Sequence, residues 1–347
     1  MKLLKITSLI LATICFISPA MDDIVYARVR TGVFDVSDYE ISLLNEYTYY
    51  YPDRELPQVV RKEIEPIKKT TLFFNISGFI DNWQYHLDSN FEFDEDNNEY
   101  EGYNFNLDRF TMSSLLGKGI VEIGKKKWVW GEGFISNPTN PLSVGEEYWG
   151  LDYSRVMGVN DLNVGAVYTD GGLADIDIES SGNADFLVWL RWGGLLESSN
   201  YTLTATFDDQ RRVNLGIDFS TDLTMDITTY TAYNHSISDS GGENSYLLGI
   251  EYFMEKMLFI LEYSSDKQDM VLLSINSSDI FSDYSWSVKE IINLDDDSRR
   301  ESVSFSYQNN DYATPTLECF RHTGEKGSYY SGSPWDWGIG LSVRIEL

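Results

Sequence analysis

The chain has 347 residues and is strongly acidic, with 55 Asp and Glu against 26 Lys and Arg. This charge balance repels the phosphate backbone of nucleic acid, so we exclude nucleic acid as a partner. Aromatic residues make up 14% of the chain, whereas proline occurs only 8 times. A polar, aromatic-rich composition is unusual for a soluble enzyme and typical of a membrane β-barrel with aromatic girdles.

The first 20 residues have the three parts of a secretory signal peptide. Lys2 and Lys5 give a positive n-region, residues 6–17 give an apolar core, and a small-residue cleavage site ends at Ala20. The apolar run is shorter than the roughly 20 residues that a membrane-spanning helix needs. We therefore predict export and cleavage near Ala20, with cleavage after Ala27 as a second option.

The remainder of the sequence offers two destinations. No later segment is long and apolar enough to form a membrane-spanning helix. The exported chain is therefore either a soluble secreted or periplasmic protein or a β-barrel membrane protein. Cys319 is the one cysteine left after cleavage, so an intrachain disulfide is excluded.

The N-terminal part of the exported chain is predicted to form a periplasmic segment, a first strand and a loop. Residues 21–38 are expected to form a short periplasmic segment. In the stretch 39–50, Ile41 and Leu43 begin an alternation of apolar and polar residues, which predicts a first strand. Residues 51–70 carry three prolines among charged residues and are predicted to form a loop.

From about residue 70 to the end, apolar and polar residues alternate with a period of two, which indicates β-strands. In 211–219, for example, Leu215 and Ile217 lie on one face, and Asn214 and Asp218 lie on the other. The segments are about as long as the roughly 9–11 residues of a tilted transmembrane strand. The predicted strands after residue 70 are 71–80, 83–93, 103–113, 119–128, 149–157, 162–169, 185–192, 201–207, 211–219, 223–233, 245–253, 257–264, 268–275, 284–293, 300–307, 312–320 and 337–347.

These strands predict an all-β fold, a transmembrane antiparallel up-and-down β-barrel that occupies 39–347 as one domain. We expect about 18 strands, with 16 or 14 as the alternatives. A soluble β-sandwich also alternates. The number and length of the strands and the polarity of their second face nevertheless favour a membrane barrel, whose apolar side faces lipid and whose lumen tolerates charge.

The last predicted strand has apolar residues at every second position from Trp337 to Leu347. This pattern resembles the C-terminal insertion signal of outer-membrane barrels, although those usually carry phenylalanine where this chain has Leu347. The resemblance implies an outer-membrane location, with the lipid bilayer and lipopolysaccharide around the barrel and the barrel-assembly machinery as partner of the last strand. An ordinary terminal edge strand is the alternative, and the oligomeric state is left open.

Long and short connections alternate along the chain, as expected when outside loops alternate with periplasmic turns and both termini face the periplasm. Long connections are predicted at 94–102, 131–148, 170–184, 234–244 and 321–335. This alternation places acidic clusters at the outer mouth, where they would concentrate cations. The outer-mouth acidic residues are Asp94, Glu95, Asp96, Asp295, Asp296 and Asp297.

Closely spaced carboxylates can bind Ca²⁺ or Mg²⁺. None of these clusters has the glycine-containing spacing of a calcium loop, so we expect solvated loops and no cofactor.

Charged residues of both signs lie on the faces that are predicted to line the lumen. Mixed charges across a lumen create a transverse field that orders water and ions, as in general diffusion pores. The same charges could instead form salt bridges that plug a closed structural barrel. The predicted lumen-lining residues are Glu92, Asp108, Glu122, Lys126, Arg191, Arg212, Asp218, Asp226, Glu251, Glu262 and Arg344.

The stretch 124–133, GKKKWVWGEG, departs from simple alternation and is followed by two Asn-Pro pairs, at Asn137 and Asn140. It is similar to a basic, then Trp-Gly element followed by an Asn-Pro loop in some porin-like outer-membrane families. Prolines and glycines make such a loop stiff and rich in turns. We expect a surface loop here, with a loop that folds inward and constricts the lumen as the alternative.

Enzyme signatures are missing from the sequence. It has 3 histidines, and it lacks the zinc-protease, serine-hydrolase and phosphate-loop motifs. His86 and Asp88, on one polar strand face, are most simply explained as residues that line a wet lumen. We predict a passive pore for small hydrophilic solutes with a modest cation preference and no catalytic or metal-binding residues. The alternatives are a non-conducting structural or adhesive barrel, a barrel enzyme, and a soluble exported β-protein that binds carbohydrate.

Overall fold

The computed structural model describes residues 30–31, 34–52, 67–94, 103–131, 133–142, 146–168, 186–239, 241–277, 283–307, 313–325, 328–330 and 335–346. The predicted signal peptide, Glu95, Asp96 and Leu347 lie outside these residues. The part of the chain that is described contains no helix with the length and apolarity that crossing a membrane requires.

Strands make up nearly all of the described residues, and most of them overlap the predicted segments closely. The predicted bounds are wrong at β2, which begins at Phe34 instead of residue 39, at β3, which begins at Ile67 inside the predicted loop, and at β12, which is shifted toward the C-terminus. The strands are β1 (Arg30–Thr31), β2 (Phe34–Pro52), β3 (Ile67–Ile80), β4 (Trp83–Asp94), β5 (Tyr103–Leu116), β6 (Gly119–Lys127), β7 (Glu147–Met157), β8 (Asn160–Tyr168), β9 (Phe186–Leu196), β10 (Ser199–Asp208), β11 (Val213–Asp222), β12 (Ile227–Ser238), β13 (Gly241–Met254), β14 (Met257–Ser265), β15 (Asp269–Ser277), β16 (Tyr284–Asn293), β17 (Arg299–Tyr307), β18 (Ala313–Thr323) and β19 (Trp335–Glu346).

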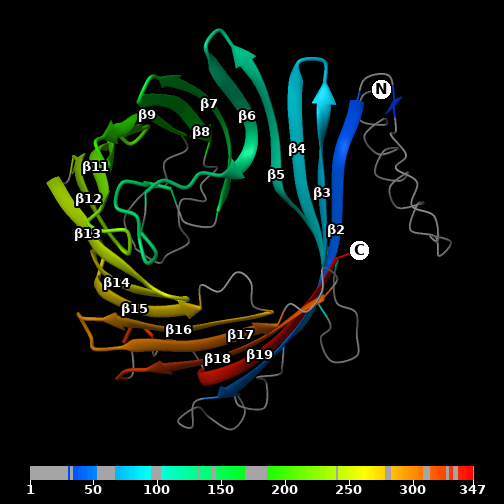
Figure 1. Cartoon of the computed structure of the whole chain (residues 1–347), viewed down its shortest axis with the longest axis vertical. Helices are drawn as coiled ribbons and strands as arrows, with labels where there is room; N and C mark the ends of the chain where they lie inside the picture. Colours follow the sequence, from blue (N-terminus) through cyan, green and yellow to red (C-terminus); the bar gives the residue numbers. More distant parts are fainter. Residues whose placement is uncertain are drawn as a thin grey trace.

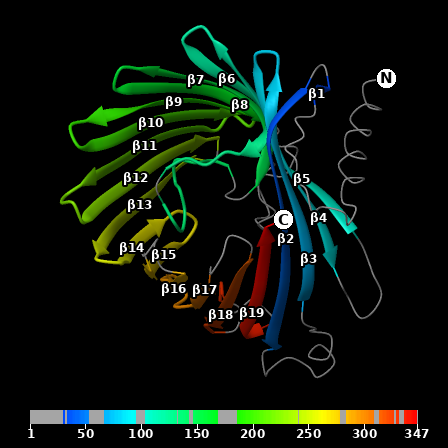
Figure 2. The same ribbon diagram turned by 45° about the vertical axis from the view of Figure 1, so that its right-hand side comes forward.

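The long strands β2 to β19 form one closed antiparallel sheet. Each of them pairs with its neighbours in the chain, and β19 pairs with β2 from Trp335↔Pro52 to Glu346↔Ser42, which closes the ring. The two residues of β1 pair only with β2 among the described strands and add no wall to the barrel. The prediction of an 18-stranded antiparallel barrel is therefore confirmed (Figure 1). Figure 2 shows the tilt of the strands around the same ring.

The barrel is inverted relative to a soluble protein, because its apolar residues lie on the outside. On β11, Leu215 is 48% exposed and Ile217 is 44% exposed, whereas Asp218 and Ser220 are buried on the inner face. The outer face of most other strands carries exposed Leu, Ile, Val, Phe, Tyr or Trp side chains in the same alternation. Such a surface is unfavourable in water and favourable in hydrocarbon, so the barrel suits a bilayer.

The two ends of the barrel differ in their connections. At one end, where β2 begins and β19 ends, most of the strands are joined by two-residue turns, and we call this the turn end. The opposite end, called the loop end, holds most of the long connections, including 128–146 and 324–334. The first residue of several of these two-residue turns has a positive φ, as tight hairpins require. These residues are Asp81, Gly117, Gly158, Glu197 and Glu255.

One predicted long connection is wrong. The stretch 234–244 is not a loop, because β12 continues to Ser238 and β13 begins at Gly241. In this hairpin Ser236 pairs with Glu243, and polar side chains lie on both faces of the strands. The apolar and polar alternation fades there although the backbone pairing continues, so the pattern alone underestimated the strands.

Ile217→Arg should destabilise the barrel in a bilayer by roughly 2–4 kcal/mol, the cost of a basic side chain at the lipid-facing midplane. Unfolding of the protein in lipid vesicles measures the effect. Thr202→Arg is the control, because Thr202 lies on the inner face of neighbouring β10, and it should cost far less. Equal destabilisation by the two variants would contradict the assignment of the faces.

Candidate functional site: a lumen divided by an inner loop

Most of the predicted lumen residues lie on the inner face of the barrel. Arg212 precedes β11, and its Nε donates to Asp208 at 2.7 Å. Asp226 was wrongly assigned to a strand face, because residues 223–226 form the turn between β11 and β12, and its side chain is exposed at the turn end. The inner-face residues are Glu92, Asp108, Glu122, Lys126, Arg191, Asp218, Glu251, Glu262 and Arg344.

The segment after β6 folds into the barrel. Figure 1 shows it, in the blue-green of β6, running inside the ring of strands toward β13 and β14. We call residues 128–142 the inner loop. The expectation of a plain surface loop is wrong, and the inward fold is what the structure contains. The prolines and glycines are consistent with a surface loop and with an inward loop, because they predict many turns but not whether the loop folds outward or inward.

Glu262 is the main anchor of the inner loop. This residue lies on the inner face of β14 and is 0% exposed. Its carboxylate accepts backbone N–H groups of Phe134 at 2.8 Å and Ile135 at 2.7 Å, and the hydroxyl of Tyr230 at 2.8 Å. A buried carboxylate is costly unless donors surround it, and here three donors do so. The Glu262 carboxylate therefore holds the loop in place, and the N–H groups of the loop offset the cost of burying the carboxylate.

A second anchor lies on β11. The hydroxyl of Thr139 contacts both oxygens of the buried Asp218, at 2.8 and 2.9 Å. A Cβ on Gly216 would lie 2.9 Å from Thr139, so the loop can approach the wall this closely only because Gly216 has no side chain. The hydroxyls of Ser136 and Ser264 are also in contact. The inner loop is thus fixed to the wall at three points.

The first residues of the inner loop belong to an aromatic cluster inside the barrel. The ring of Trp189 on β9 lies 5.0 Å from that of Trp128 and 5.3 Å from that of Trp130. Trp128 also donates its indole N–H to the carbonyl of Tyr148 at 3.2 Å. The remaining buried members are Leu142, Val167 and Leu187. This cluster fills part of the lumen and gives the loop a rigid base.

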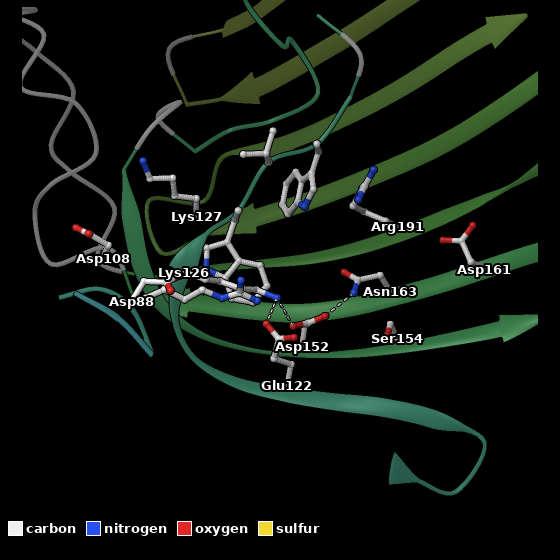
Figure 3. A pocket seen from close by; sticks show the side chains of 14 residues that line it. Asp88, Asp108, Glu122, Lys126, Lys127, Asp152, Ser154, Asp161, Asn163 and Arg191 are labelled. Carbon is white, nitrogen blue, oxygen red and sulfur yellow. Dashed lines mark hydrogen bonds and ion pairs between the residues drawn. The ribbon is translucent and has the colours of Figure 1, made fainter. Parts of the chain in front are cut away.

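A polar network begins beside this cluster and crosses four strands, and Figure 3 shows its members on β6, β7 and β8. Lys126 pairs with Glu122 at 2.5 Å and with Asp152 at 3.3 Å. Asp152 in turn accepts from the amide of Asn163 at 2.7 Å, and the Asn163 carbonyl accepts the indole N–H of Trp189 at 2.5 Å. The network holds these side chains along one wall of the lumen.

A cavity of about 670 Å³ lies between this wall and the start of the inner loop. Five carboxylates and four basic groups line it, so its charges nearly balance. Lys126 lies 4.0 Å from the ring centre of Trp128, and the guanidinium of Arg191 lies 5.2 Å from that of Trp130. The cavity is lined by Asp88, Asp108, Arg109, Glu122, Lys126, Lys127, Trp128, Val129, Trp130, Asp152, Ser154, Asp161, Asn163 and Arg191.

Of the outer-mouth acidic residues, only those of the β16–β17 connection have described side chains. Asp295 accepts the backbone N–H of Asp269 at 3.1 Å. Asp296 accepts backbone N–H groups of Ser298 at 3.0 Å and Tyr329 at 2.6 Å. Hydrogen bonding, first from the Ser298 side chain, lowers the pKa of Asp296 below its ordinary value. Asp295 and Asp296 therefore join connections at the loop end, whereas Asp297 is exposed.

The cavity offers charged and hydrogen-bonding groups to a solute. Within the described residues, no group of three or more His, Cys, Asp or Glu side chains is arranged to hold a metal ion. His86 lies 3.0 Å from Asp88, as two polar neighbours on a lumen wall can. Sequence reasoning found Glu262 as a lumen charge but missed its role as an anchor, and it missed Thr139 and Ser136. Nothing in the sequence pattern links Glu262 and Ser264 to the inner loop, which lies more than 120 residues earlier in the chain.

The fold is shared with known outer-membrane proteins. The structure is similar to Pseudomonas aeruginosa OccK5 (OpdH), with a TM-score of 0.63 and 9% identity, covering 89% of this chain and 97% of that one. It is also similar to OccK2 (OpdF), with a TM-score of 0.64, 9% identity and coverage of 89% and 98%. P. aeruginosa OpdK, whose structure was determined with vanillate, gives a TM-score of 0.63, 9% identity and coverage of 89% and 98%. No family model matches the sequence, and no curated protein sequence is similar to it.

Glu262→Gln should loosen the inner loop, because a glutamine amide nitrogen cannot accept from one of the two backbone N–H groups. A buried donor left unsatisfied costs about 1–3 kcal/mol. Hydrogen–deuterium exchange at Phe134 and Ile135 should therefore accelerate. Glu318→Gln, at an exposed position on β18, makes the same chemical change without touching the described loop and should leave the exchange unchanged. Equally slow exchange in both variants would show that Glu262 is not the anchor.

Proposed function

We propose that the protein is an outer-membrane channel for passive diffusion of small hydrophilic solutes. The observation that carries the proposal is a lumen cavity lined by charges of both signs and bounded by an anchored inner loop, inside a barrel with an apolar outer face. The similarity in fold to OccK5 and OpdK supports it. The proposed outer-membrane location follows from the apolar outer face of the barrel and from its terminal strand, which we propose is inserted by the barrel-assembly machinery.

The inner loop sets the size of what can pass. Glu262 holds its backbone N–H groups, and Asp218 and Ser264 contact its hydroxyls, so its position does not depend on the solute. Charged side chains opposite the loop order water and favour solutes that exchange hydration for polar contacts. We propose selection by size and polarity, without a covalent step.

A modest cation preference follows from the charge placement. Carboxylates outnumber basic groups by one around the cavity, and Lys126 is already paired with two of them. Exposed acidic groups at the loop end, such as Asp297, add to the local cation concentration within a Debye length of about 8 Å at physiological salt. Arg109 and Arg191 oppose this effect, which limits the preference.

The other functions are less well supported. A soluble carbohydrate-binding protein would not expose apolar side chains around its whole circumference. In addition, Lys126 and Arg191 cover faces of Trp128 and Trp130 that a sugar ring would need. A structural barrel is the second candidate, and the aromatic cluster that fills part of the lumen favours it.

Purified protein in a planar bilayer should form conducting channels, and the reversal potential under a salt gradient should indicate cations. The bias should shrink as ionic strength rises, since salt screens the charges. Asp161→Asn should weaken the bias and Arg109→Gln should strengthen it, because both residues line the cavity with opposite charge. Anion selectivity would contradict the cation preference. A folded, inserted barrel without conductance would overturn the channel and leave the structural barrel.

A further inference from the structure

The outer face of β16 to β19 carries a trough at the loop end. Three rows of outward-facing side chains cross these four strands in register. The middle row consists of short apolar side chains. The row on its turn-end side consists of bulky apolar side chains, those of Trp286, Phe305, Leu317 and Leu341. The row on its loop-end side is polar and contains Glu290, Glu301, Arg321 and Trp337. The middle row, which forms the floor of the trough, contains Val288, Val303, Cys319 and Ile339.

The trough is a real depression of about 550 Å³. Each of the four strands lines the trough with three consecutive residues, and the first and third of these face outward. The trough therefore lies on the outer face of the barrel. Cys319 has the smallest side chain of the floor and pairs with Val303 on one side and Ile339 on the other. The floor is therefore lower than the rows on either side of it.

The polar row carries an available cation. Glu290 pairs with Arg299 at 3.4 Å, which neutralises both. Arg321 is exposed between Glu301 and Trp337, and it makes no hydrogen bond or ion pair with any side chain in the described residues. Its guanidinium offers several N–H donors in one plane, which matches the oxygens of a phosphate.

The position of the trough indicates what covers it. Arg321 lies two residues from the end of β18 at the loop end, so in a bilayer the polar row would lie at the level of the lipid headgroups and the floor just below, among acyl chains. An anionic headgroup over Arg321 and an acyl chain along the floor would complement both parts at once.

We propose that this trough binds a phosphorylated glycolipid of the outer leaflet, with a phosphate on Arg321 and an acyl chain on Val303, Cys319 and Ile339. The inference rests on the proposed outer-membrane location. The overall acidity of the chain does not oppose it, because Arg299 neutralises Glu290, and the charges of Glu301 and Arg321 in the same row balance each other. A second copy of the chain is the competing occupant, and it would not require a phosphate.

The test measures binding of a bis-phosphorylated acyl glucosamine disaccharide to the detergent-solubilised full chain by native mass spectrometry. Arg321→Gln should weaken binding about tenfold, as loss of a charge-assisted contact does. The same variant should not change binding of the dephosphorylated lipid. Cys319→Phe fills the floor and should weaken binding of both lipids.

Matched controls separate a specific site from general lipid adhesion. Arg211→Gln removes an exposed arginine from the β10–β11 connection at the same end, and Leu248→Phe adds bulk to the outer face of β13, so both should bind as the unchanged protein does. Unchanged lipid binding in Arg321→Gln or Cys319→Phe would overturn the proposal. It would also be overturned if these variants kept the lipid but changed from oligomer to monomer. Channel conductance of the same preparations shows separately whether the proposed function itself holds.

Discussion

Closure of the sheet is the constraint on which the rest of this structure depends. In hydrocarbon no water is present to satisfy an exposed edge, so every backbone N–H and C=O of a membrane sheet must pair within the protein. Pairing of β19 with β2 removes both edges at once. The closed ring then forces two environments, lipid outside and lumen inside, and each strand supplies both by simple alternation of apolar and polar side chains.

The inner loop follows from the polar interior. A lumen lined by carboxylates and hydroxyls can bind the backbone N–H groups and hydroxyls of a loop, which an apolar core could not. Glu262 and Asp218 use this property to hold the loop against β11 and β14. Two buried charges that would each be unfavourable alone become the attachment points of the element that narrows the lumen. The charged residues of the wall therefore determine the position of the loop.

Sequence alone predicted the barrel, its strand number and the direction of its faces, because alternation and length carry that information along each strand. It failed where information lies between distant residues. The course of residues 128–142 depends on contacts with Asp218 and Glu262, which no local pattern links to them. It also failed at strand ends: Asp226 lies in a turn and 234–244 in a hairpin, because strands that reach water no longer need an apolar face.

In the channel that we propose, the inner loop stays attached to the barrel wall while ions pass it. Ser136 and Ser264, whose hydroxyls are in contact, allow a direct test with Ser136→Cys and Ser264→Cys in a Cys319→Ser background. Single-channel conductance is measured before and after oxidation, with disulfide formation checked by mass spectrometry. We expect the disulfide to form and conductance to stay unchanged, because the loop already occupies the cross-linked position. Failure of the inserted protein to cross-link, or a change in conductance on cross-linking, would contradict it.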